Sequence, residues 1–394
     1  MTHSGHWQCF IANLGATRVC VLVTGGRPVS EIRAGVTFGF NKGLLSRHTV
    51  GKPVSRIEVR NVSIVTTAAY GLLAVSIAFA VVVSARAVER PPLTIEAKIP
   101  LGDVRGRIDH LAIDHARQRL FVAELGNNSI SIVDLKEQKV LHRITGLNEP
   151  QGVAYDSDVD LIFVSNGGDG SVRTFSGDDF SPRGRIDLGE DTDNLRVDQS
   201  NDLVFAGFGS GGLAIIDARS PEKVVEIALK GHPEGFELEP AGKRVFVNVP
   251  DAREIAIIDR LSNAQIASWK TSEASANFPM AVQQKAPELL TVFRRPPRLA
   301  AIDTRSGNVN TGVSTCGDAD DVFVDDKRGR AYVSCGDGFI DVFQLDGLSR
   351  INHMPTAIGA RTSLYDPDMN RFFLAVNAAH GLAAAIWVYE PEEN

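Results

Sequence analysis

The chain has 394 residues, of which 43% are hydrophobic and 36 are glycine, and its formal net charge is −7. This length suits one or two globular domains. No basic cluster occurs in the C-terminal three quarters, which argues against a nucleic-acid partner because phosphate binding needs a concentrated positive surface. Glycine is enriched and helix-favouring runs are scarce, so the composition favours an all-β fold.

Residues 1–60 match neither an export signal nor the repeats that follow. Export signals normally start close to the N-terminus. We therefore interpret residues 1–60 as a leader that is either disordered or the product of a mis-called start, with translation truly beginning near Val59.

Residues 61–87 have the pattern of a signal peptide or a signal anchor. The segment Val62–Val83 is apolar apart from Ser and Thr, and its 22 residues are enough to span a hydrocarbon core. Arg56 and Arg60 precede it, and Ala85-Arg86-Ala87 matches the small-x-small cleavage pattern. Cleavage after Ala87 predicts a periplasmic or secreted protein. Without cleavage, residues 62–83 would anchor it to the membrane, and the positive flank would still place the rest outside the cytoplasm.

After residue 88 the sequence repeats. An apolar strand that usually ends in an acidic residue recurs at intervals of 41 to 43 residues, as LAID, VAYD, LRVD, FELE, MAV, VFVD and SLYD. Each is followed by a second strand such as LFVA, a turn usually rich in Gly, Asn or Asp, a third strand such as SISIVD, and a weaker fourth. Self-similarity at this period predicts a blade of four strands. The alternation in Ser129–Val133 predicts one buried face for that third strand.

Seven units fill residues 107–394, and the last lacks a fourth strand because the chain stops. A spare strand, Leu93–Leu101, precedes the first unit. We therefore predict that residues 88–394 form a seven-bladed β-propeller, closed by this N-terminal strand completing the last blade.

The strings FVAELGNNSISIVDL, FVNVPDAREIAIIDR and YVSCGDGFIDVF resemble the YVTN-type propeller repeat of YncE-like exported proteins. The resemblance covers about residues 93–394, although the third repeat (FAGFGSGG) departs from the pattern and the fifth (TVFRRPPRL) departs further. It implies an exported seven-bladed propeller and carries over no general set of catalytic residues.

In a propeller, the loops that enter the inner strands lie on one face, around the central channel, where ligands usually bind. The residues predicted nearest the channel axis are Asp109, His110, Gln151, Asp193, Asn194, Glu234, Asn277, Asp320, Asp321 and Arg361.

This ring could hold a divalent cation through oxygen ligands. It could equally hold a polar organic ligand, with Arg361, Arg294 and Arg295 pairing with an acidic group. The bland alternative is that these residues only form turns and bind channel water.

Cys316 and Cys335 are predicted to reach the same face, at the entry and at the second strand of the sixth unit. In an oxidising compartment they would form a disulfide that clamps the loop Asp318–Asp321.

The sequence favours a monomeric binding or scaffold protein that takes a partner protein or small polar ligand at the rim, and no catalytic residue is singled out. The alternative is a propeller hydrolase or lyase of the lactonase type, with a metal or acid/base group at the same rim.

Overall fold

The computed structural model describes residues 8–14, 17–23, 91–240, 242–379 and 381–393. The chain divides into two compact units, residues 1–85 and 86–394. In the first unit, β1 (Gln8–Leu14) and β2 (Thr17–Val23) pair as an antiparallel hairpin. The rest of the expected leader and all of the expected export segment lie outside the described residues. Within the described part of the chain, no helix is both long and apolar enough to cross a membrane.

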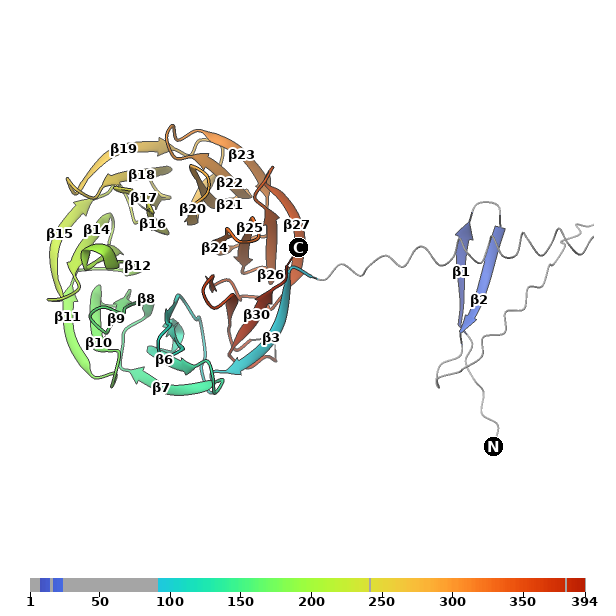
Figure 1. Ribbon diagram of the computed structural model, residues 1–394, viewed down its shortest axis with the longest axis horizontal. Coiled ribbons are helices and arrows are strands. Elements are labelled where there is room, and N and C mark those ends of the chain that lie inside the picture. Colours follow the sequence, from blue (N-terminus) through green and yellow to red (C-terminus); the bar gives the residue numbers. More distant parts are fainter. Residues whose placement is uncertain (1–7, 15–16, 24–90, 241, 380, 394) are drawn as a thin grey trace, which may run out of the picture. The chain divides into compact units, whose positions relative to one another are not determined.

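The second unit is a ring of seven sheets, each of four antiparallel strands, which confirms the predicted propeller (Figure 1). The inner strands are β4 (Leu111–Asp114), β8 (Pro150–Asp156), β12 (Thr192–Asp198), β16 (Phe236–Leu238), β20 (Ser275–Val282), β24 (Ala319–Asp325) and β28 (Ser363–Asp366). The second strands are β5 (Arg119–Glu124), β9 (Leu161–Asn166), β13 (Leu203–Phe208), β17 (Arg244–Val249), β21 (Glu288–Arg295), β25 (Arg330–Cys335) and β29 (Arg371–Val376).

The third strands are β6 (Ser129–Asp134), β10 (Ser171–Ser176), β14 (Gly212–Asp217), β18 (Glu254–Asp259), β22 (Pro297–Asp303), β26 (Phe339–Gln344) and β30 (Ala385–Pro391). The outer strands are β7 (Lys139–Thr145), β11 (Pro182–Asp187), β15 (Glu222–Ala228), β19 (Ala264–Lys270), β23 (Val309–Ser314), β27 (Ser349–Pro355) and β3 (Leu93–Pro100). Two short 3₁₀ turns, η1 (Leu125–Asn127) and η2 (Gln199–Asn201), interrupt the loops. β3 pairs with β30 from Leu93↔Pro391 to Pro100↔Ala385, so the seventh sheet takes its outer strand from the start of the ring.

The acidic residues that recur at strand ends have a local structural cause. Asp114 closes β4 and accepts the backbone N–H of Arg117 at 3.0 Å, and Asp325 closes β24 and accepts that of Arg328 at 3.1 Å. The third strands end in the same way, since Asp134 accepts two N–H groups of the following turn. A carboxylate in this position satisfies turn donors that the sheet leaves unpaired. The acidic signature of the repeat therefore marks turns and not a chemical site.

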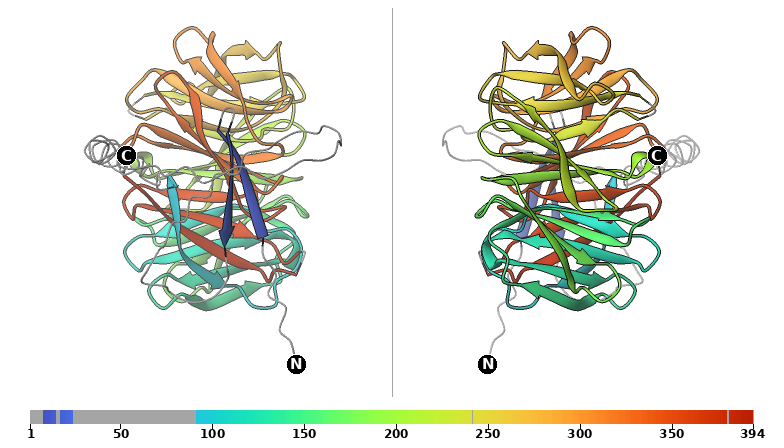
Figure 2. Two further views of the ribbon diagram at one scale, coloured as in Figure 1. Left: turned by 90° about the vertical axis from the view of Figure 1, so that its right-hand side faces the viewer. Right: turned by 90° about the vertical axis from the view of Figure 1, so that its left-hand side faces the viewer.

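The blades pack face to face around the ring, as the edge-on views show (Figure 2). One core cluster joins Phe121, Ile130 and Ile132 of the first blade to Ile162 and Val164 of the second. The prediction of a single buried face for β6 is wrong, because Ser129 and Ser131 are as fully buried as the isoleucines between them. Both serine hydroxyls donate at 2.5 Å to the buried carboxylate of Glu124, which satisfies them on the second packed face.

Candidate functional site

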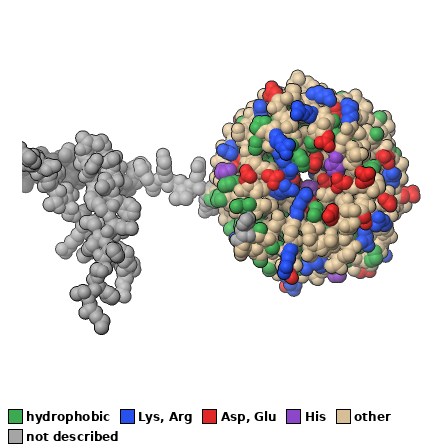
Figure 3. All heavy atoms as spheres, turned by 180° about the vertical axis from the view of Figure 1, so that it is seen from behind, with side chains coloured by type: hydrophobic (Ala, Val, Ile, Leu, Met, Phe, Trp, Pro, Cys, Tyr) green, Lys and Arg blue, Asp and Glu red, His purple; other side chains and the backbone are tan. Residues whose placement is uncertain are grey.

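A cavity of about 470 Å³ opens at the centre of the ring and is lined by residues from all seven blades. Charged side chains gather around the central opening on the face shown in Figure 3. The lining combines six carboxylates with four guanidinium groups and two imidazoles. Deeper residues are apolar, among them Leu111, Val153, Leu195, Met280 and Leu364. A cavity of this size is large enough for a small molecule.

Hydrogen bonds between blades hold the rim in place. The backbone N–H of His110 donates to the carbonyl of Gln151 at 3.2 Å, which joins the first blade to the second. The N–H of Gly235 donates to the carbonyl of Phe278 at 3.1 Å, joining the fourth to the fifth. A Cβ atom on Gly235 would lie 2.6 Å from that carbonyl oxygen, so the residue after Glu234 must be glycine for the blades to approach this closely. The loops therefore present their side chains on a fixed frame.

Eight of the ten predicted rim residues line the cavity: His110, Gln151, Asp193, Asn194, Glu234, Asp320, Asp321 and Arg361. The other two do not. Asp109 is fully buried next to the cavity, with its carboxylate 2.6 Å from the guanidinium of Arg107. Asn277 is fully buried between blades, where its amide donates to Asn248 at 2.7 Å and to the carbonyl of Glu254 at 3.1 Å.

On the side formed by the sixth and seventh blades, the carboxylates pair with arginines of the same chain. The guanidinium of Arg361 lies 2.8 Å from Asp318 and 3.0 Å from Asp320. Arg294 also pairs with Asp320, donates to the carbonyl of Ala319 at 2.8 Å, and stacks 3.7 Å from the ring centre of Phe278. These arginines, which the sequence suggested for an acidic ligand, are thus already paired with the chain's own carboxylates. Arg295, the third of that set, is exposed and does not line the cavity.

On the side formed by the third and fourth blades, His232 and Asp193 shift each other's pKa values. The imidazole of His232 lies 3.9 Å from the Asp193 carboxylate, and its Nδ1 is 2.6 Å from the carbonyl of Gly209. Burial alone would lower the pKa of His232, but Asp193, the Gly209 carbonyl and Glu234 outweigh it and raise that pKa to about 9. Burial would likewise raise the pKa of Asp193, but the imidazoles of His232 and His110 and the charge of Arg107 lower it.

Four carboxyl groups in or next to the cavity have raised pKa values. Burial raises the pKa of Glu237, although Arg196 opposes the shift. Burial and the charge of Asp193 raise the pKa of Glu234 to about 8. Burial raises that of Asp321 to about 7, although its Oδ2 accepts the N–H of Ser363 at 2.7 Å and His110 lies 3.9 Å away. Burial also raises the pKa of Asp109 well above its ordinary value. Groups shifted this far cluster at functional sites more often than elsewhere.

Arg196, Glu237 and Phe278 are among the lining residues that sequence reasoning missed. Arg196 donates to Glu237 at 3.1 Å, from strand β12 to strand β16. Both are charged residues inside apolar inner strands, LRVD and FELE, and that anomaly was the signal that could have found them.

No group of three His, Cys, Asp or Glu side chains with an arrangement suited to a metal ion occurs among the residues that the structure describes. Asp109 and Asp320 pair instead with arginines, and Asp193 lies 3.9 Å from the imidazole of His232. The geometry therefore gives no support to the divalent-cation hypothesis.

The predicted disulfide between Cys316 and Cys335 is confirmed, with Cα atoms 5.9 Å apart. Both residues are buried. The bond ties the loop that enters β24, and therefore Asp318 and Asp320, to the end of β25.

No family model and no curated protein matches this chain, so the resemblance to the YVTN repeat is not confirmed by a family match. Among solved structures, a chain of Kuenenia stuttgartiensis hydrazine synthase superposes with a TM-score of 0.63 at 16% identity, covering 69% of this chain and 94% of that one. A chain of a mitotic checkpoint complex superposes with a TM-score of 0.62 at 14% identity, covering 76% and 97%. At these identities the likeness defines the class as a seven-bladed β-propeller and defines no activity.

Proposed function

We propose that this protein is a binding propeller whose central cavity holds a small polar organic ligand. The observation that carries the proposal is the cavity itself, where side chains of all seven blades converge on about 470 Å³ of space. Its volume lies within the usual range for ligand sites, and the many charged groups of its lining suit a polar ligand.

A thermal-shift screen of the full-length protein tests this function. The panel contains cationic, anionic, zwitterionic and neutral small molecules. The variant Leu364→Trp fills the cavity from its wall, and Ile358→Trp is the matched control because Ile358 is 64% exposed and outside the cavity. We expect at least one compound to raise the melting temperature of the wild type and the control but not of Leu364→Trp. If no compound does so, or if every hit stabilises all three proteins equally, the cavity is not a binding site.

A second candidate function is an acid/base enzyme of the hydrolase or lyase type. It is favoured by one observation: Asp193 and Glu234 lie on neighbouring blades, and their pKa values are displaced in opposite directions. Such a pair provides a carboxylate and a protonated acid at the same pH. Turnover of lactone substrates that is lost in Glu234→Gln, and insensitive to a chelator, would support this function. Absence of turnover across the lactone panel would count against it.

We also propose that the propeller is exported through residues 61–87. The disulfide supports this, because such bonds persist mainly in oxidising compartments. N-terminal sequencing of the mature protein should begin at Val88 if the signal is cleaved. Recovery of the protein in the cytoplasmic fraction with both thiols reduced would contradict export.

A further inference from the structure

On the side of the cavity formed by the third and fourth blades, hydrogen-bond acceptors outnumber donors. The Oδ1 atoms of Asp193 and Asn194 are buried and have no hydrogen-bond partner, although the two residues are only 8% and 4% exposed. Both line the cavity. Buried acceptors without a donor are costly and uncommon, so a pair of them at one cavity wall needs an explanation.

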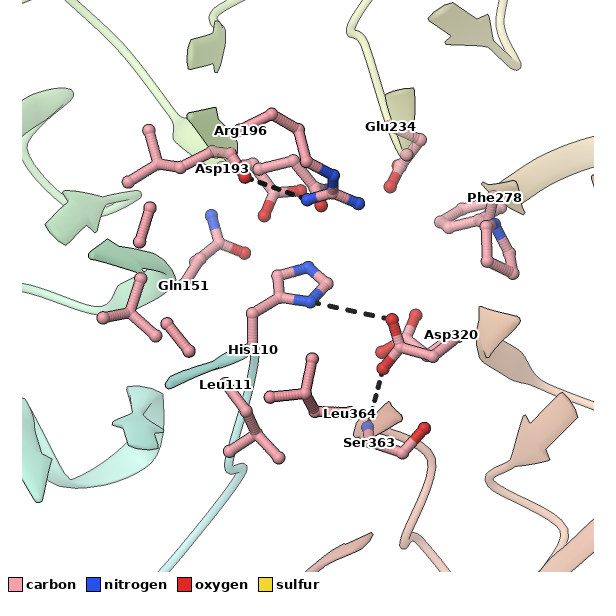
Figure 4. Close-up of a pocket in the computed structure, with 18 of the residues that line it drawn as sticks. His110, Leu111, Gln151, Asp193, Arg196, Glu234, Phe278, Asp320, Ser363 and Leu364 are labelled. Atoms are coloured by element: carbon pink, nitrogen blue, oxygen red, sulfur yellow. Dashed lines mark hydrogen bonds and ion pairs between the residues drawn. The ribbon is translucent and has the colours of Figure 1, made fainter. Parts of the chain in front are cut away.

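Glu234 adds a third acceptor group to the same side. Its carboxylate makes no hydrogen bond and no ion pair within 4.0 Å with any residue that the structure describes. Two other carboxylates, Asp193 and Asp320, are among the charged groups that raise its pKa. Figure 4 shows Asp193 and Glu234 on the same side of His110, both facing the opening.

The arginines that line or border the cavity pair with other carboxylates and not with Asp193, Asn194 or Glu234. Arg294 and Arg361 pair with Asp318 and Asp320, Arg196 pairs with Glu237, and Arg107 pairs with Asp109. His232 is 3.9 Å from the other oxygen of Asp193, beyond hydrogen-bond distance. No side chain that the structure describes donates to these atoms, so a ligand or water in the cavity would supply the missing donors.

We propose that the ligand carries a primary alkylammonium group, which donates to Asp193, Asn194 and Glu234 while its hydrocarbon part contacts Leu195 and Met280. An ammonium group has three N–H donors and no acceptor, so it can donate once to each of the three residues, and its positive charge is opposite in sign to that of the two carboxylates. The apolar lining beyond the charged groups suits the attached carbon chain. This inference rests on the proposed binding function and narrows it to one chemical class.

The same group occurs in free amines and in the lysine side chain of a partner protein. The test therefore uses n-butylamine for the first source and Nα-acetyl-lysine amide for the second. Neutral n-butanol and anionic butyrate have chains of similar size and serve as charge controls.

Isothermal titration of the full-length protein at pH 8.5 measures the four probes. We expect n-butylamine to bind and the two charge controls not to bind. Glu234→Gln and Asp193→Asn should each weaken binding of the amine at least about 10-fold, since each removes one charged acceptor while keeping its shape. Glu149→Gln is the matched control, because Glu149 is exposed on the same face and does not line the cavity.

Affinity for the amine should also rise between pH 6 and pH 8.5. Glu234 loses its proton over this range, under the influence of Asp193, His232, Asp320 and Arg294. The Glu234→Gln variant should lose most of this dependence.

Binding of butyrate or butanol in preference to the amine would overturn the ammonium assignment and leave the binding function standing. Binding of the amine unchanged in both variants would also overturn it. If neither amine binds, the ammonium proposal is wrong, and the broader screen with Leu364→Trp decides separately whether the cavity binds anything. Binding of the lysine amide alone would keep the ammonium site and assign it to a protein partner.

Discussion

The two sides of the central cavity differ in how far the chain satisfies its own charges. On the side of the sixth and seventh blades, Asp318 and Asp320 are held by two arginines, and a disulfide fixes their loop. On the side of the third and fourth blades, Glu234 has no such partner and Asp193 keeps one buried oxygen without a donor. The charges of the first side are satisfied within the chain, whereas the second is the side where we propose that a ligand binds.

Breaking the neutralised side should have the largest effect. Asp320→Ala leaves Arg294 and Arg361 short of a buried partner, and we expect it to lower the free energy of unfolding by about 4 kcal/mol. Urea denaturation measures this. Asp103→Ala, which breaks an ion pair with both side chains more than four-fifths exposed, is the control and should change stability by less than about 0.5 kcal/mol. Equal effects of the two variants would contradict the comparison.

Removing the disulfide should also destabilise the side formed by the sixth and seventh blades. Replacing both Cys316 and Cys335 by alanine removes a cross-link between residues 19 apart, and the expected loss is about 3 kcal/mol. The midpoint of urea unfolding, compared with the wild type under reducing and oxidising conditions, checks this. Reduction should destabilise the wild type and leave the double variant unchanged.

Glu234→Gln should raise the free energy of unfolding, unlike the two preceding changes. Burial and Asp193 raise the pKa of Glu234 from 4.5 to about 8, so the folded state holds a proton that the unfolded chain releases. This carboxyl therefore lowers stability progressively as pH rises from about 4.5 to about 8. A shift of this size corresponds to at most about 5 kcal/mol. Because Glu234 is partly exposed to water, we expect the variant to be more stable than the wild type by about 2 kcal/mol at pH 8.5, and the two to be equal at pH 4. A variant less stable than the wild type at pH 8.5 would show that Glu234 has a partner.

The smallest effect concerns the titration of His232. Because its pKa is raised from 6.5 to about 9, its contribution to stability is complete below pH 6.5 and is lost as pH rises through about 9. The imidazole resonances in NMR should titrate with a midpoint near pH 9. Asp193→Asn should move that midpoint down, and a midpoint that stays in place would mean that Asp193 does not act on this imidazole.

The architecture could be predicted from the sequence because each blade repeats its strands and turns at a nearly constant interval, and because Asp114 and Asp325 cap the same turn in different blades. The lining of the cavity could be predicted only in part. Asn277 occupies the position in its repeat that faces the cavity in other blades. Its side chain instead lies between two blades, where its amide donates to Asn248. Whether such a side chain points into the cavity or between blades depends on packing between neighbouring blades, and no local sequence pattern encodes this packing.

The second packed face of β6 was unpredictable for the same reason. Alternation of serine and isoleucine normally indicates a solvated face, but Glu124 supplies buried acceptors for both hydroxyl groups. The signal was the single acidic residue at the end of β5, whose role becomes clear only once two blades are stacked.

Burial of the middle strands on both faces has a consequence for how the ring comes apart. A blade contributes one wall to each of two neighbouring cores, as Phe121 and Ile162 do between the first and second blades. Unfolding of any one blade would expose the cores that it shares with both neighbouring blades. A closed ring also has no terminal repeat at which unfolding can begin. A protease should therefore meet either an intact ring or an extended chain, with few stable fragments in between.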